Sequence, residues 1–158
     1  MASYFAEIAP IRYEGPDSLT LRGDAAALET AVLNLLDNAV KYSREAVEVG
    51  VELKADGAGR AQLRVRDRGI GMSRAHIAFI FNRFYRIGAE VRRSRTGTGL
   101  GLFIVKSVVK GHRGTITADS AGPERGSTFT MALPGVMVED ATAGSGAAAP
   151  EARAGARA

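Results

Sequence analysis

The stretch NLLDNAVKYS, residues 34–43, says more about the fold than any other part of this sequence. It ends a longer segment, 25–42, in which apolar residues recur at the spacing of one helix face. Those apolar residues are Leu28, Val32, Leu35, Leu36 and Ala39. Gly23 and Asp24 come directly before the segment, and an aspartate at that place favours a helix N-cap. We therefore predict a long helix over 25–42.

A second face of this helix is polar. Asn34, Asn38, Lys41 and Tyr42 lie together on it, because their spacings match one and two helical turns. The face could simply be solvated. However, asparagine is a poor helix former, so two of them one turn apart need a reason. An amide oxygen suits Mg²⁺, and a lysine one turn further on could reach a phosphate.

The stretch DRGIGM, residues 67–72, follows a predicted strand. Leu63, Val65 and Asp67 share one face of that strand, so the aspartate lies on the core side and needs a donor. Two sources of a hydrogen bond to Asp67 remain possible. The carboxylate could cap the following turn through backbone N–H groups. It could also accept a hydrogen bond from a ligand amine, with Gly69 and Gly71 letting that ligand approach the backbone.

The stretch GTGLGL, residues 97–102, opens a second predicted helix over 100–110. Free N–H groups at a helix N-terminus attract anions, and glycines let a phosphate come close to them. The spacing does not match the dinucleotide fingerprint, and no Gly-Lys-Ser/Thr follows as a P-loop requires. A flexible loop that ends at a helix is the alternative interpretation.

The remaining pattern predicts an α+β domain with helices on one face of a mixed sheet. Ser73 is expected to cap a short helix. Residues 1–138 form the predicted domain, and the Ala/Gly-rich residues 139–158 form a predicted disordered tail. The predicted strands are 4–13, 19–21, 46–54, 61–67, 114–119 and 127–133.

Composition excludes several classes of protein. The 158 residues include no cysteine, so disulfides and cysteine-ligated metal are excluded. The net charge is +4, but the arginines are scattered, which argues against a nucleic-acid partner. No apolar run is long enough for a membrane span, and the start does not resemble a signal peptide. We expect a cytoplasmic domain, whose parent protein could be anchored in a membrane.

In chain order, the motifs resemble the ATP-binding catalytic domain of bacterial sensor histidine kinases. Residues 34–43 resemble its N box, 67–72 its first glycine box and 97–102 its second glycine box. IFNRFYR at 80–86 resembles the phenylalanine box, and GSTFTMALP at 126–134 resembles the closing strand. The resemblance implies the Bergerat fold, a two-layer α/β sandwich whose mixed, mostly antiparallel sheet is covered on one face by helices.

The resemblance also implies ATP and Mg²⁺ as cofactors and gives roles at the phosphate end of the site. Asn38 would ligate Mg²⁺, and Asn34 would support the metal and the phosphates. Lys41 would contact phosphate. Arg86 and Arg95 match basic positions near the γ-phosphate.

At the purine end, the resemblance implies that Asp67 accepts from the adenine amino group. Gly69 and Gly71 would line the adenine pocket, Tyr42 would line the nucleotide pocket, and Thr128 would sit near the adenine.

Residues 87–99 would form a mobile lid over ATP. The positions implied to bind nucleotide at the end of the lid and the start of the second helix are Thr98, Gly99, Leu100, Gly101 and Leu102.

One departure separates branches of the wider superfamily. Its ATP-hydrolysing members carry a glutamate, the general base for water, where this chain has Asn34. An amide cannot accept that proton, so we expect slow hydrolysis and transfer of the γ-phosphoryl group to another acceptor.

His76 and His112 lack the acidic neighbours of an acceptor histidine and are interpreted as structural. Phe81, Phe84 and Tyr85 are either core residues or partly exposed for docking.

The expected function is therefore transfer from Mg-ATP to a histidine on a separate dimerisation and phosphoacceptor domain, with a response regulator as an indirect partner. A protein serine kinase of the anti-sigma-factor type is the alternative within the same fold. Two further hypotheses are a nucleotide-binding switch without transfer and an electrostatic binder of nucleic acid, whose binding would be sensitive to salt and unaffected by ATP.

Overall fold

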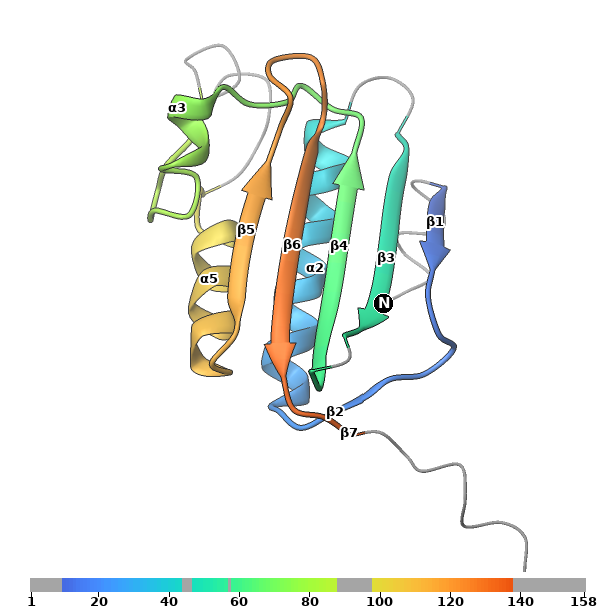
Figure 1. Cartoon of the computed structure of the whole chain (residues 1–158). Coiled ribbons are helices and arrows are strands. Elements are labelled where there is room, and N and C mark those ends of the chain that lie inside the picture. Colours follow the sequence, from blue (N-terminus) through green and yellow to red (C-terminus); the bar gives the residue numbers. More distant parts are fainter. Residues whose placement is uncertain (1–9, 44–46, 57, 88–97, 138–158) are drawn as a thin grey trace, which may run out of the picture.

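A five-stranded sheet and two helices packed on one of its faces form the body of the protein (Figure 1). The computed structural model describes residues 10–43, 47–56, 58–87 and 98–137. The helices are α2 (Ala25–Tyr42), α3 (Arg74–Ile77) and α5 (Gly101–Gly111). The predicted α+β sandwich is confirmed. The predicted tail, 139–158, lies outside the described residues.

Helix α2 has the predicted limits. Asp24 is its N-cap and accepts a hydrogen bond from Ala27 N over 3.0 Å. Ala31, Leu35 and Ala39 are fully buried along its inner face, where the sheet and α5 cover them. Leu35 and Ala39 belong to the predicted apolar face. Ala31, one turn before Leu35, was not predicted as part of that face and is also buried.

The strand order of the main sheet is β1-β3-β4-β6-β5. β1 pairs with β3 in parallel, and every other neighbouring pair is antiparallel. The predicted mixed, mostly antiparallel sheet is therefore confirmed. The strands are β1 (Ile11–Glu14), β3 (Val49–Ala55), β4 (Arg60–Asp67), β5 (Thr115–Asp119) and β6 (Ser127–Pro134).

Some predicted limits were wrong. The described part of the first strand begins at Ile11 and passes Tyr13, while residues 4–9 lie outside the described residues. A small second sheet pairs β2 (Thr20–Leu21) with β7 (Val136–Met137), and the sequence pattern did not predict β7. Ser73 precedes α3 but its side chain makes no capping hydrogen bond.

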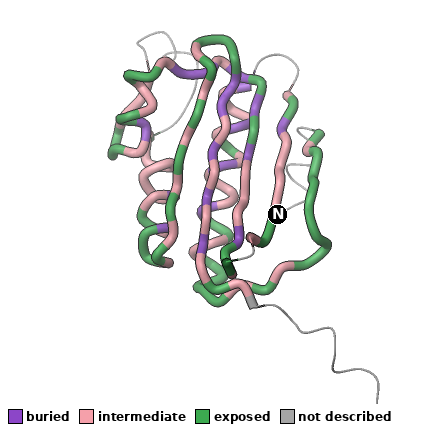
Figure 2. Tube along the Cα trace, viewed as in Figure 1, coloured by how far each residue is buried: buried purple, intermediate pink, exposed green. Residues whose placement is uncertain are grey.

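The two faces of the sheet differ in chemistry. Buried residues concentrate along α2, β4 and β6 (Figure 2). On β6, Phe129, Met131 and Leu133 point to the helices and are almost fully buried. Thr128 and Thr130 alternate with them, in register with Arg66 and Arg64 on the opposite face.

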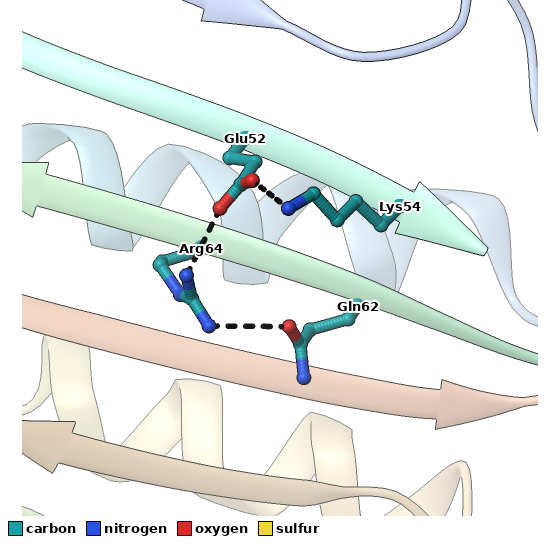
Figure 3. Close-up of polar contacts among 4 residues, drawn as sticks. All are labelled: Glu52, Lys54, Gln62 and Arg64. Atoms are coloured by element: carbon teal, nitrogen blue, oxygen red, sulfur yellow. Dashed lines mark hydrogen bonds and ion pairs between the residues drawn. The ribbon is translucent and has the colours of Figure 1, made fainter. Parts of the chain in front are cut away.

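That opposite face is polar and paired (Figure 3). Arg64 Nη1 donates to Glu52 Oε2 over 3.0 Å and its other terminal nitrogen contacts Gln62. Lys54 also pairs with Glu52. The hydrogen bond from Lys54, with a smaller contribution from Arg64, holds the pKa of the Glu52 carboxyl below its usual range. These exposed pairs keep the open face of the sheet hydrated and contribute little to stability.

His112 connects the start of α2 to the end of α5, at the end of the domain far from Asp67. Its Nε2 accepts from Asp24 N over 2.9 Å, and its Nδ1 lies 2.8 Å from Val108 O. Because a carbonyl only accepts and an amide N–H only donates, the ring is the neutral Nδ1–H tautomer. His112 thus has the structural role expected from the sequence, joining the start of α2 to the end of α5.

Candidate nucleotide-binding site

A cavity of about 180 Å³ opens between α2, the end of β4 and the start of α5. It brings together most of the residues predicted for the site. These are Asn34, Asn38, Lys41, Tyr42, Asp67, Gly71, Arg86, Thr98, Gly99, Gly101 and Leu102. Residues from four separate stretches of the sequence therefore line one space.

Three of the predicted residues that the structure describes are not part of this lining. Gly69, Leu100 and Thr128 do not reach the cavity, and Arg95 lies outside the described residues. Leu100 is the residue before α5, with helical φ and ψ of −101° and −21°, and serves to start the helix. The predicted lid, 87–99, is described only at its ends, so its behaviour stays a prediction.

The two asparagines of α2 are oriented by the helix itself. Asn34 Nδ2 donates to Thr30 O and Asn38 Nδ2 donates to Asn34 O, each over 2.8 Å. These backbone bonds occupy the amide nitrogens, which leaves each Oδ1 to accept from a ligand or to bind a cation. Both side chains line the cavity.

The start of α5 approaches these amides closely. A β-carbon on Gly101 would stand 2.8 Å from Asn34 Oδ1 and 3.5 Å from Asn38 Nδ2. Only glycine lets the first turn of α5 come so near to α2. The N–H groups of that turn therefore face the same space as the amide oxygens, an arrangement suited to an anion and its counter-cation.

Lys41 and Tyr42 form the end of the α2 wall. Lys41 Nζ lies 5.8 Å from the centre of the Tyr42 ring, and both residues line the cavity. Tyr42 O accepts from Ile70 N over 3.0 Å, which joins α2 to the segment after β4. A β-carbon on Gly69 would stand 2.1 Å from Tyr42 O, so Gly69 is needed for this backbone contact rather than for lining the cavity.

Asp67 is the buried carboxylate of the site, with an exposed fraction of 4%. Its Oδ1 accepts from Gly69 N over 2.8 Å and from Ser127 N over 3.1 Å. Burial raises the pKa of Asp67, and the two backbone hydrogen bonds oppose that rise. Among the described residues no fully buried polar side-chain atom lacks a partner, so Oδ2 still opens onto the cavity.

The local interpretation of Asp67 is confirmed, and the interpretation that it accepts from a ligand stays a prediction. One carboxylate oxygen holds the turn through backbone N–H groups, as the local interpretation predicted. The other oxygen remains for a ligand donor.

The prediction that Thr128 sits near the adenine is not supported by its position. Thr128 pairs with Arg66 and lies on the open face of the sheet, because residues of a strand alternate between its two faces. Its neighbours Ser127 and Phe129 line the cavity instead. The signal was available in the sequence: Ser127 and Phe129 share the parity of the apolar residues Met131 and Leu133.

The aromatic stretch 79–85 is divided between core and surface. Phe81 packs edge-on to Phe129, and Tyr85 lines the cavity while its hydroxyl lies 2.7 Å from His76 Nδ1. Phe79 and Phe84 are 51% and 65% exposed. Of the three residues expected to be core or partly exposed, Phe84 is exposed, whereas Phe81 and Tyr85 are half-buried. Phe79 was not part of that expectation.

Mg²⁺ fits the donors that the site offers. No group of three histidine, cysteine, aspartate or glutamate residues within the described ranges could hold a metal alone. The amide oxygens of Asn34 and Asn38 are hard donors of the kind that Mg²⁺ accepts, although too few to bind it without further oxygens. A metal here would thus share its coordination with a bound phosphate ligand.

The fold and the site define a nucleotide-binding ATPase domain, and comparison with known families agrees. Residues 23–136 match the family of histidine kinase-, DNA gyrase B- and HSP90-like ATPases, and the chain belongs to that family. Within it, the chain matches the catalytic domains of sensor histidine kinases.

Particular relatives are mycobacterial. The chain is 39% identical over 124 residues to the sensor-like histidine kinase SenX3 of Mycolicibacterium smegmatis, covering 78% of this chain and 32% of SenX3. It thus spans about a third of the length of that relative. It is 36% identical to a solved mycobacterial sensor histidine kinase, MprB, with a TM-score of 0.72 and coverage of 85% and 88% of the two chains.

A second solved structure carries a nucleotide analogue. It is full-length ShkA in complex with AMPPNP, 26% identical, with a TM-score of 0.70 and coverage of 87% of this chain and 28% of ShkA.

None of the helices described here has the length and hydropathy to cross a membrane.

Proposed function

We propose that this chain binds Mg-ATP in the cavity and transfers its γ-phosphoryl group to a histidine on a separate dimerisation and phosphoacceptor domain. The observation that carries the proposal is that two different sets of groups line the two ends of one cavity. Asp67 provides a buried carboxylate at one end, and Asn34 and Asn38 face the N-terminus of α5 at the other. This separation suits a purine at one end and phosphates at the other.

At the purine end, Asp67 Oδ2 accepts a hydrogen bond from the adenine amino group. The burial that raises the pKa of Asp67 also shields this bond from water, which makes it more effective than an exposed one. Tyr42, Ser127 and Phe129 line the surrounding space.

At the phosphate end, the backbone N–H groups at the start of α5 and the Lys41 ammonium attract the phosphates. Bound Mg²⁺ would neutralise charge on the phosphates, with Asn38 Oδ1 as its ligand and Asn34 in support. Arg86 lies in the cavity wall, and Arg95 is proposed to join it near the γ-phosphate.

Asn34 also limits the reaction with water. By the family resemblance, its position is the one that holds the general base in the ATP-hydrolysing branches, and an amide accepts no proton there. Hydrolysis is therefore slow. In the transfer, the bond from the γ-phosphorus to the bridging oxygen breaks, ADP leaves, and the unprotonated imidazole nitrogen of the acceptor forms the new bond to phosphorus with its lone pair, while the proton on the other ring nitrogen passes to solvent or to a base.

The exposed rings of Phe79 and Phe84 favour docking of a partner domain beside the cavity. Both lie in the stretch that also places Tyr85 and Arg86 in the cavity wall. The proposed partner is the phosphoacceptor domain, and a response regulator would receive the phosphoryl group from it later.

The test is phosphotransfer from labelled ATP to the cognate dimerisation domain supplied as a second chain. We expect acid-labile, base-stable label on the acceptor, and none when its histidine is replaced by glutamine. Asp67→Asn serves as the matched inactive donor. Label that is acid-stable and located on serine would instead favour the anti-sigma-factor type of kinase. ATP binding with no transfer to any acceptor would favour a nucleotide switch.

A further inference from the structure

The loop between β5 and β6, residues 120–126, packs along the segment 69–72 that follows Asp67. Glu124 N donates to Ile70 O over 2.6 Å. The bond is short and joins two loop backbones that are more than fifty positions apart in the sequence. The loop therefore supports the segment from behind.

Further contacts leave no space between the two stretches. Gly126 N donates to Gly69 O over 3.2 Å. A β-carbon on Gly71 would stand 2.2 Å from Gly122 O, and the φ of Gly71 is +62°. Only glycine satisfies both conditions at position 71, so the segment is fitted closely to the loop.

One side chain, Ser120, stands at the centre of this contact. Its Oγ accepts from Met72 N over 3.0 Å and from Gly122 N over 3.3 Å. It donates towards Gly126 O at 2.7 Å, with Gly122 O further away at 3.1 Å. A hydroxyl has one proton and two acceptor lone pairs, so the bonding capacity of Ser120 is fully used.

The residues that Ser120 holds are part of the cavity wall. Ile70, Gly71 and Met72 line the cavity together with Asp67, whereas Ser120 does not reach it. Met72 is 6% exposed. Met72 N donates its hydrogen bond to Ser120 Oγ, so this hydroxyl is the side-chain group that, within the described residues, holds the Met72 end of the wall.

We propose that Ser120 is a positioning residue that sets the preference of the cavity for adenine over guanine. The inference rests on the proposed binding of ATP. Adenine offers an amino group to Asp67, whereas guanine offers a carbonyl oxygen at the same ring position, which the carboxylate repels. A fixed wall prevents guanine from shifting to a position in which its own N–H groups could donate to Asp67. A loosened wall permits that shift.

Removing the hydroxyl leaves Met72 N without its acceptor, so the segment 70–72 moves or takes up water. Ser120→Ala should lower affinity for ATP about tenfold while GTP affinity changes about twofold or less, so that the ATP-to-GTP ratio falls. Both effects should be the same with and without Mg²⁺, because the phosphate end is untouched.

The experiment is competition calorimetry of ATP and GTP with the whole chain, with Mg²⁺ and with EDTA. Ser107→Ala is the matched control. Its hydroxyl also donates to a backbone carbonyl, Phe103 O at 2.9 Å, but on the exposed side of α5. Its ATP-to-GTP ratio should equal that of the wild type. Ser120→Cys, a weak donor and acceptor of similar size, should give an intermediate ratio.

The outcomes separate the two proposals. A wild-type chain that folds but binds neither nucleotide would contradict the proposed function itself. A wild type that prefers ATP, beside a folded Ser120→Ala with the same ratio, would overturn only the positioning role. Failure of both Ser120 variants to fold would also overturn it, since the hydroxyl would then be required by the whole domain rather than by this wall.

Discussion

Asp67 on β4 and Ser127 on β6 stand opposite each other, and the Ser127 backbone N–H donates to Asp67 Oδ1 over 3.1 Å. Gly69 N donates to the same oxygen. The neighbouring strand β6 therefore helps to fix the direction of the carboxylate, and Oδ2 is the atom that faces the cavity. One oxygen of Asp67 thus holds the fold, and the other is proposed to accept from a ligand.

Replacing Asp67 by asparagine should weaken ATP binding about 10- to 100-fold, as expected for the loss of a hydrogen bond to a charged group. The amide oxygen can keep the two backbone bonds, and its NH₂ group then faces the adenine amino group, donor against donor. Calorimetry with and without Mg²⁺ should give the same loss. Purine riboside triphosphate, which lacks the amino group, should bind both proteins alike. Unchanged ATP affinity would remove Asp67 from the purine site.

The raised pKa of Asp67 predicts how its effect on stability changes with pH. A carboxyl with a higher pKa in the folded state binds more protons there than in the unfolded state. Stability therefore falls as pH rises from the ordinary aspartate pKa through the raised one, and the unfavourable contribution is complete above it. Subtracting the free energies of unfolding of Asp67→Asn from those of the wild type, at each pH in urea, isolates this contribution. A difference that grows more favourable to the wild type with rising pH would contradict the prediction.

Asn38→Ala should affect only the metal-dependent part of binding. Removing a metal ligand should weaken Mg-ATP binding about 10- to 100-fold, by analogy with the sensitivity of metal sites to their supporting groups. In EDTA, the affinity for ATP should stay within about twofold of the wild type, since Asn38 makes no purine contact. Asp67→Asn, which loses affinity in both conditions, is the comparison. An equal loss for Asn38→Ala in both conditions would show that its amide does not hold the metal.

Gly101→Ala should separate stability from binding. Alanine is a better helix former than glycine, so the free energy of unfolding should not fall by more than about 0.5 kcal/mol. The new methyl would meet Asn34 Oδ1 at 2.8 Å, so the Asn34 side chain must move. Affinity for ATP should drop about tenfold while affinity for adenosine stays unchanged. Thermal unfolding and calorimetry on one preparation test both statements, and an equal loss for adenosine would place the damage at the purine end instead.

Phe84→Gly tests the exposed aromatic surface. Phe84 has a φ of +61°, a conformation that glycine adopts without strain, so stability should rise by about 1 kcal/mol. ATP affinity should not change, because Phe84 does not line the cavity. Transfer to the phosphoacceptor domain should slow if the ring contacts that partner. A transfer rate equal to the wild type, at subsaturating acceptor, would exclude Phe84 from docking.

Local sequence signals predicted much of this protein because they act over a few residues. The cap at Asp24 and the limits of α2 follow from hydrogen bonding and helical periodicity within one segment. Strands β5 and β6 follow from the alternation of apolar and polar residues within each segment. The presence of Asn34 and Asn38 on one polar face follows from helix geometry.

The predicted residues that do not line the cavity are explained by relations between segments. Gly69 was expected at the cavity, but the carbonyl of Tyr42, from another element, occupies the space beside it. Thr128 was expected near the adenine, although the alternation of β6 turns it to the open face and turns Ser127 inward. The contact between the β5–β6 loop and segment 69–72 has no local signal at all, since each side is only a turn by itself.

The sequence alone determined the helices, most of the strands and the boxes at 34–43, 67–72, 80–86 and 97–102, because propensity, capping and periodicity depend on residues close together in the chain. Only the tertiary structure decided that β6 lies between β4 and β5 and that Ser127 donates to Asp67. It also decided that Ser120 supports the segment that follows that carboxylate. Such contacts join residues far apart in the chain, and they exist only once burial of the common core has fixed the strands side by side.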